Sequence, residues 1–286
     1  MIFLLVSGHF RTFNKGDRLM SFSPGFLRPV NLKPCVFFDI DGTWLRWQLF
    51  DEWIQKCVEL GILPAIVLAM AEKERRAYKL REAPFVDFMN ALVDAYCGDR
   101  RLAGMRVSDA RFAAKAVMEE KGRMVHVFTS RLARAAEDCG KERVIISGSP
   151  REAVAAFAEY FGIKLFLGTE HSYEKGVFTG KEHLVWANQK GKAIKKLAAE
   201  NELDLSRSVG IGDSASDAEM LKLMQYPICF NPEQGLLAQA RASRWPVVWE
   251  KKDVFTFYRS DAEGKLHEVS ISDILPQDLA KALQAA

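Results

Sequence analysis

Two aspartates, Asp39 and Asp41, stand two positions apart directly after a short apolar run. Residues i and i+2 of an extended segment project to the same side, so the two carboxylates can converge, and Gly42 allows a sharp exit. Nearby carboxylates repel each other and need a cation or a shared proton. Asp213 follows another apolar run and would supply a third carboxylate. A set of oxygen ligands with room left for water suits Mg²⁺.

The elements that must position these residues are strands that alternate with helices. Short apolar, β-rich runs bounded by turn residues predict strands at 36–38, 143–146, 164–167, 208–211, 227–230 and 246–249. The alternation indicates an α/β fold with a doubly wound parallel sheet, a Rossmann-like core. Ligands of such sheets bind beyond the carboxyl ends of the strands, where Asp39, Ser147 and Asp213 would meet.

Residues 50–140 follow a different pattern, because apolar positions there recur at helical spacing and strand signals are few. Helical segments are expected at 52–60, 65–80, 84–96 and 108–121. The stretch is too long for one crossover, so we expect a helical cap inserted into a core made of 34–49 and 141–286. The cap carries four basic residues, which are expected to form a solvated helix face; a site for a second negative group of a substrate is the alternative. They are Arg75, Arg76, Lys79 and Arg81.

Residues 1–33 stand apart from the rest of the chain. They begin with an apolar run and then become basic and polar, the reverse of the order in a signal peptide. We expect a loosely ordered N-terminal extension or an early strand. A weaker hypothesis places the natural start at Met20.

Composition narrows the class of protein. The net charge is +3, from 40 basic and 37 acidic side chains, which is too balanced to indicate nucleic acid or an anionic membrane as a partner. Five scattered cysteines without a C-x-x-C pair indicate neither a disulfide framework nor a zinc site, and they fit a cytoplasmic protein. Outside the N-terminus the longest apolar run is shorter than the roughly 20 residues of a spanning helix. The oligomeric state is left open.

The short motifs of this chain resemble those of the haloacid dehalogenase-like hydrolases. Residues 36–43, with the string D-x-D-G-T, are similar to the first motif, and residues 210–217 are similar to the fourth. Residues 145–149 resemble the second motif, a strand that ends in Ser or Thr. Lys192 fits the third, a lysine that opens a helix. The insertion after the first motif resembles the helical-cap group that includes phosphoserine phosphatase.

The resemblance implies a Mg²⁺-dependent phosphomonoesterase acting on a small phosphorylated metabolite. Asp39 would attack phosphorus to give an aspartyl-phosphate, and Asp41 would act as general acid and then general base. Magnesium would be held by the Asp39 carboxylate, the Asp41 backbone carbonyl and Asp213. Asp217 would support the metal site. The phosphate group would be bound by Ser147, Gly148 and Lys192.

Several alternatives stay open at this point. Ser147 could be a turn residue, Lys190 competes with Lys192, and Asp217 could only favour a helix N-terminus. A phosphotransferase or mutase could use the same aspartyl-phosphate. A non-catalytic phosphate-binding module is the third and more distant function, since neither Asp39 nor Asp41 is missing.

Overall fold

The structure, a computed structural model, describes residues 32–183 and 187–285. All but the last two residues of the expected N-terminal extension lie outside the described residues. The main body is a nine-stranded sheet in the order β4-β3-β2-β1-β5-β6-β7-β8-β9. Its strands are β1 (Cys35–Phe38), β2 (Glu142–Pro150), β3 (Leu165–Glu174), β4 (Val177–His183), β5 (Val209–Gly212), β6 (Tyr226–Phe230), β7 (Val247–Lys251), β8 (Val254–Ser260) and β9 (Leu266–Glu268).

The centre of the sheet is parallel and its edges are antiparallel. Strands β3, β2, β1, β5, β6 and β7 pair in parallel, whereas β4 pairs with β3, and β8 with β7 and β9, in antiparallel fashion. The adjacent strands β1 and β5 are short and buried throughout, as expected for a sheet that is covered on both faces. The predicted α/β class with a parallel, Rossmann-like sheet is confirmed.

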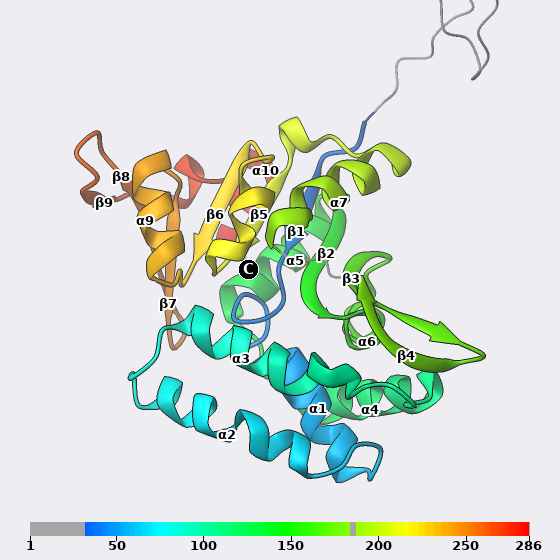
Figure 1. The fold of residues 1–286 in the computed structure, drawn as a ribbon. Coiled ribbons are helices and arrows are strands. Elements are labelled where there is room, and N and C mark those ends of the chain that lie inside the picture. The colour runs from blue at the N-terminus through cyan, green and yellow to red at the C-terminus, as the bar shows by residue number, and fades with distance from the viewer. Residues whose placement is uncertain (1–31, 184–186, 286) are drawn as a thin grey trace, which may run out of the picture. The chain divides into compact units, whose positions relative to one another are not determined.

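Helices cover both faces of this sheet (Figure 1). The side chains of β1 alternate between them: Val36 and Phe38 join one apolar cluster with residues of α5, α6 and α10, while Cys35 and Phe37 join another with residues of α7, α8 and α9. The helices are α5 (Val127–Asp138), α6 (Arg151–Tyr160), α7 (Ala187–Glu200), α8 (Ala218–Leu221), α9 (Gln234–Ser243) and α10 (Gln277–Ala285). Four 3₁₀ turns are η1 (Gly98–Arg100), η2 (Leu205–Arg207), η3 (Ala215–Asp217) and η4 (Ile271–Asp273).

Four further helices follow β1 and gather at one end of the sheet, in the lower part of Figure 1. They are α1 (Leu49–Glu59), α2 (Ile66–Lys79), α3 (Phe85–Cys97) and α4 (Val107–Lys121), close to the four predicted cap segments. Trp53 of α1 is fully buried, and its indole N–H donates to the carbonyl of Ala110 in α4 at 2.9 Å. Helix α5 also lies within residues 50–140, but it packs against β1, β2 and α10.

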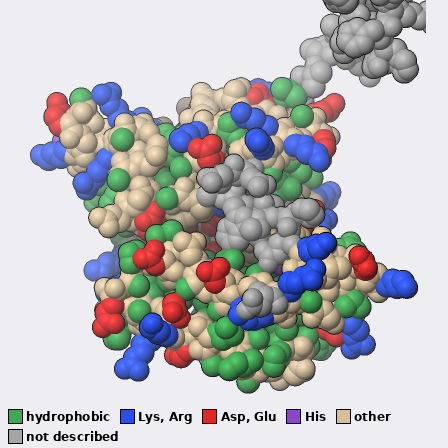
Figure 2. All heavy atoms as spheres, viewed as in Figure 1, with side chains coloured by type: hydrophobic (Ala, Val, Ile, Leu, Met, Phe, Trp, Pro, Cys, Tyr) green, Lys and Arg blue, Asp and Glu red, His purple; other side chains and the backbone are tan. Residues whose placement is uncertain are grey.

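Charged side chains of both signs are interspersed over the surface seen in Figure 2. This pattern matches the nearly balanced charge of the sequence. Among the described residues, no helix combines the length and apolar character needed to cross a membrane.

Candidate active site

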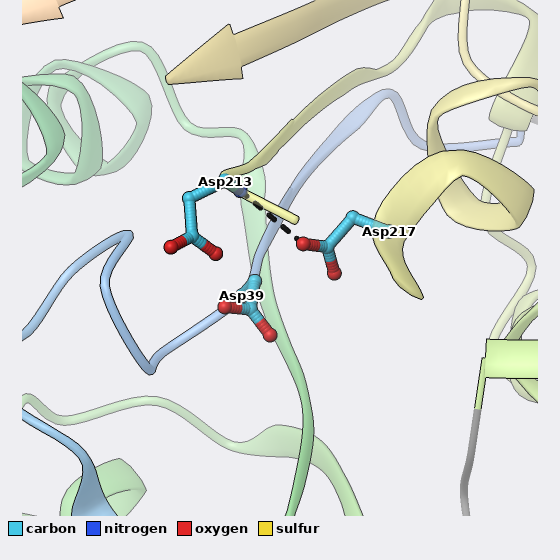
Figure 3. A group of neighbouring side chains, drawn as sticks. All are labelled: Asp39, Asp213 and Asp217. Carbon is cyan, nitrogen blue, oxygen red and sulfur yellow. Dashed lines mark hydrogen bonds between the residues drawn. The ribbon is translucent and has the colours of Figure 1, made fainter. Parts of the chain in front are cut away.

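Three carboxylates meet at the carboxyl ends of two neighbouring parallel strands, β1 and β5. Asp39 follows β1, Asp213 follows β5, and Asp217 ends the turn η3 that comes next. One oxygen of each lies within 4.8 Å of the others, and Figure 3 shows the three side chains close to one another. Asp39 is 5% exposed and Asp217 is fully buried. The structure therefore brings together the predicted Asp39, Asp213 and Asp217.

Lys190, near the start of α7, provides a positive charge beside this group. Its Nζ donates to Asp217 Oδ1 at 2.7 Å and to Asp39 Oδ1 at 3.2 Å. Asp217 Oδ2 accepts in turn from the backbone N–H groups of Asp213 and Ser214, at 3.2 and 3.1 Å. Asp217 thus links the lysine to the loop that carries Asp213.

The structure places Lys190, and not the Lys192 predicted from the third motif, beside the carboxylates. Lys192 is exposed, whereas Lys190 is buried. Residues two apart on an α-helix point about 200° away from each other, so only one of the two can face the sheet. Lys190 shares its face of α7 with the buried Ile194 and Ala198, at spacings of four and eight. That spacing was a sequence signal in favour of Lys190.

The electrostatics of this group call for a further cation. Burial and the Asp217 carboxylate raise the pKa of Asp39, with Lys190 as a partial offset. Burial and the charges of Asp39 and Asp217 raise the pKa of Asp213 as well. Burial alone would lower the pKa of Lys190, but Asp217 and Asp39 outweigh it and raise that pKa. One ammonium group lies against three carboxylates, so their negative charge is only partly compensated when they are ionised.

The donor set fits a hard divalent ion. Carboxylate oxygens are the ligands that Mg²⁺ takes in proteins, and the described group contains neither thiolate nor imidazole. Asp39 and Asp213 are the residues best placed to hold it, because Asp217 is already engaged by Lys190 and two backbone N–H groups.

Asp41 lies beside the three carboxylates and has a different set of partners. Its Oδ2 accepts from Ser147 Oγ at 3.0 Å and from Ser149 Oγ at 2.9 Å, and its Oδ1 accepts from the N–H of Leu49. Burial raises the pKa of Asp41, and these three hydrogen bonds oppose the rise. The predicted Ser147 is brought to the site; its neighbour Gly148 instead accepts from Thr169 Oγ1 through its carbonyl, at 2.6 Å.

The turn after β1 is shaped so that Asp213 can approach. Gly42 has φ +77°, and a Cβ there would lie 2.1 Å from Asp213 Oδ2, so only glycine fits. Thr43 Oγ1 donates to Asp213 Oδ1 at 3.4 Å, and the Thr43 carbonyl accepts from Thr129 Oγ1 in α5 at 2.7 Å. Helix α5 therefore supports this edge of the sheet, which the sequence did not reveal.

Glu250 of β7 fixes the start of α5. Its side chain is 1% exposed, and it accepts from the backbone N–H of Phe128 at 2.8 Å and contacts His126 Nδ1 at 3.0 Å. It also pairs with Arg46 at 3.3 Å. Burial lowers the pKa of His126, so the ring is neutral near pH 7 and its Nδ1–H donates to Glu250. Sequence reasoning missed Glu250, because nothing in a strand of mixed residues marks one glutamate as buried.

A cleft of about 1010 Å³ lies between Asp213 and residues of the cap helices. Gly42, Asp213 and the segment 231–234 line it from the core side. The segment 46–48, which leads into α1, also lines it. The lining residues of the cap are Asp51, Glu52, Gln55, Glu72, Arg75, Tyr78, Lys79, Arg81, Ala83, Pro84, Phe85, Val86 and Phe88. A small molecule placed in the cleft can thus contact Asp213 and the cap at once.

The basic cluster of the cap is only partly a solvated face. Arg76, Lys79 and Arg81 are exposed, as expected for that interpretation. Arg75 is mostly buried and donates to Asp51 Oδ1 at 2.6 Å and to Tyr96 Oη at 2.8 Å. The Asp51 carboxylate neutralises the charge of Arg75.

Comparisons with known proteins agree with this geometry. The sequence profile of the haloacid dehalogenase-like hydrolases matches residues 36–222, more than half of the chain. The chain belongs to the haloacid dehalogenase-like hydrolase family. The predicted recognition is thereby confirmed, and with it the prediction that the chain is an enzyme, a hydrolase.

The proteins similar to this chain differ in their sequence identity to it and in the share of each chain that is covered. A protein of Streptomyces azureus named for inhibition of morphological differentiation is 35% identical over 111 residues, which are 38% of this chain and 40% of that protein. A probable phosphatase of Mycobacterium tuberculosis is 29% identical over 230 residues, 79% of this chain and 78% of that protein. A solved phosphoserine phosphatase, an analogue of its phospho-aspartyl intermediate, superposes with a TM-score of 0.51 at 19% identity, over 78% of this chain and 95% of its own. That likeness shows a shared fold.

Proposed function

We propose that this hydrolase is a Mg²⁺-dependent phosphomonoesterase that acts on a small phosphorylated metabolite through an aspartyl-phosphate on Asp39. The observation that carries the proposal is the meeting of Asp39, Asp213 and Lys190 at one edge of the sheet, with Asp41 beside them and a cleft above. Relatives named phosphatase and phosphoserine phosphatase support the reaction class. The scattered cysteines are our reason for proposing a cytoplasmic location.

Mg²⁺ would be held by Asp39 and Asp213, and when bound it would neutralise charge on the phosphoryl oxygens. Lys190, whose ammonium lies 3.2 Å from Asp39 Oδ1, would favour the anionic, nucleophilic form of Asp39 together with the bound cation. The Ser147 hydroxyl, buried near Asp41, would donate to a phosphoryl oxygen.

The phosphoryl group would be transferred in two steps. First, an Asp39 carboxylate oxygen forms a bond to phosphorus while the ester P–O bond breaks, and the proton of the Asp41 carboxyl goes to the departing oxygen. Second, water attacks the phosphorus of the aspartyl-phosphate, its proton returns to Asp41, and the Asp39–phosphorus bond breaks. The sum is one ester and one water converted to one alcohol and one phosphate.

Phosphate release from a panel of phosphomonoesters, including phosphoserine, tests the proposal. We expect turnover that needs Mg²⁺ and that falls at least 10³-fold in Asp39→Asn, because the nucleophile and one ligand charge are lost together. Asp253→Asn, at an exposed position between β7 and β8, is the matched control and should keep full activity. Activity that survives Asp39→Asn would refute the mechanism.

A further inference from the structure

Ser149, near the end of β2, contacts two of the groups assigned to the reaction. It is buried, at 3% exposure. Its hydroxyl donates to Asp41 Oδ2 at 2.9 Å, and its backbone N–H donates to Ser147 Oγ at 3.0 Å. No role follows for it from the motif resemblance, in which only the first serine of residues 147–149 is assigned.

The need for Ser149 arises from the limited capacity of Ser147. A serine hydroxyl has a single proton to donate. In the structure Ser147 donates this proton to Asp41 Oδ2, at 3.0 Å. If a phosphoryl oxygen takes that proton when substrate binds, Asp41 Oδ2 loses one of its two donors. Ser149 is the donor that stays on the same oxygen.

We infer that Ser149 is a positioning residue, which holds the Asp41 carboxyl against the departing oxygen while Ser147 is engaged by phosphate. The inference rests on the proposed function. Two contacts fix the plane of the Asp41 carboxyl in that state: the hydroxyl of Ser149 on Oδ2 and the N–H of Leu49 on Oδ1. The backbone N–H of Ser149 also donates to a lone pair of Ser147 Oγ, and this contact leaves the hydroxyl proton of Ser147 available for another acceptor.

The dependence of rate on the leaving group tests this role. Phenyl phosphate and p-nitrophenyl phosphate have similar shapes, but p-nitrophenolate is a far better leaving group and gains little from a proton donor. In Ser149→Ala we expect kcat/KM to fall about tenfold for phenyl phosphate and less than about threefold for p-nitrophenyl phosphate. The value of kcat/KM depends on the steps up to and including formation of the aspartyl-phosphate. The leaving group departs in that last step.

Three further variants complete the experiment. Asp41→Asn should also slow phenyl phosphate more than p-nitrophenyl phosphate, and by a larger factor. Ser149→Thr keeps a hydroxyl and should restore the wild-type ratio of the two kcat/KM values. Ser147→Ala is the matched control: its phosphate contact is common to both substrates, so both should slow equally. The ratio of the two constants in one preparation is independent of the folded fraction, so partial misfolding of a variant does not blur it.

The outcomes separate the two proposals. Equal losses on both substrates in Ser149→Ala, or a threonine variant as asymmetric as the alanine one, would overturn the role of Ser149 alone. Turnover of either substrate that survives Asp39→Asn would overturn the proposed function, and the inference with it.

Discussion

The charge at Lys190 is the residue-scale feature on which the carboxylate group most depends. It is the cation that the described structure places on Asp39 and Asp217, with 3% of its side chain exposed. Removing one partner of a buried ion pair leaves the other partner's charge uncompensated. The two nearby lysines of α7 provide a test of this dependence, since Lys192 is exposed.

We predict that Lys190→Met lowers kcat/KM by at least 10²-fold and the free energy of unfolding by about 3 kcal/mol without metal. Lys192→Met should change neither quantity measurably. Steady-state kinetics and urea denaturation of both variants provide the measurement. Equal behaviour of the two variants would remove Lys190 from the site.

The raised pKa values of Asp39 and Asp213 predict how metal-free stability varies with pH. Because both folded-state pKa values lie above the unfolded value of about 4, the folded state binds more protons, and unfolding free energy falls as pH rises above that value. A bound divalent cation reverses this loss. Saturating Mg²⁺, at about 100 times its Kd, should add about 2.7 kcal/mol.

Thermal melts with EDTA or Mg²⁺ at pH 5 and pH 8 would measure this linkage. We predict a larger Mg²⁺-induced rise in Tm at pH 8, because fewer protons must then leave the carboxylates. Asp213→Asn, which removes one ligand charge, should reduce the rise at both pH values. A rise that is greater at pH 5 would contradict the assignment of Asp39 and Asp213 as ligands.

At the scale of elements, the contact between β7 and α5 holds the turn that follows β1. Glu250 binds the start of α5, and Thr129 of α5 binds the carbonyl of Thr43. Burial acts to raise the pKa of Glu250, but hydrogen bonds from Phe128 and His126 outweigh it, and the net pKa is lowered. Glu250 is therefore ionised near pH 7, at a helix N-terminus that favours negative charge.

We predict that Glu250→Ala costs about 2–3 kcal/mol of unfolding free energy, the value of a buried charged group and its hydrogen bonds. The cost should shrink as pH falls through the lowered pKa of Glu250, since stabilisation by a carboxylate of lowered pKa is lost there. Glu268→Ala, at an exposed position of β9, is the control. Urea denaturation at pH 7 and at pH 4 would show a constant cost if Glu250 were not ionised.

At the scale of the whole molecule, the sequence predicts local patterns better than side-chain partners across elements. Apolar runs at β1 and β5 are buried strands because both faces of the sheet are covered, and this places Asp39 and Asp213 at one edge. Helical spacing predicts α1 to α4 for the same local reason. The packing of α5 on the sheet also depends on β1 and α10, which are far from it in the sequence, so no local pattern could predict it.

The candidate site shows the same limit. The string of Asp39 to Thr43 is local and could be recognised directly. The choice between Lys190 and Lys192 required the phase of α7, and the partners of Ser149 required the approach of Asp41 from another strand. Domain limits of 34–49 with 141–286 for the core and 50–140 for the cap remain our proposal.

We predict that a chain that begins at residue 32 keeps Mg²⁺-dependent turnover within about twofold. The contacts described at the carboxylates are made by residues that lie between β1 and β7. Kinetics of this truncated chain, with circular dichroism to verify folding, would check the prediction. A folded but inactive truncation would assign the first 31 residues a part in the reaction.

The most direct test of the central claim is to trap the phosphoryl group on Asp39. The wild-type protein would be mixed with Mg²⁺ and its best substrate, quenched in acid within milliseconds, and analysed by intact mass and peptide mapping. We predict one added phosphoryl group, labile to base, on the peptide that contains Asp39, and none in Asp39→Asn. A phosphoryl group on any other residue, or turnover with none trapped at any quench time while Asp39→Asn stays active, would contradict the account.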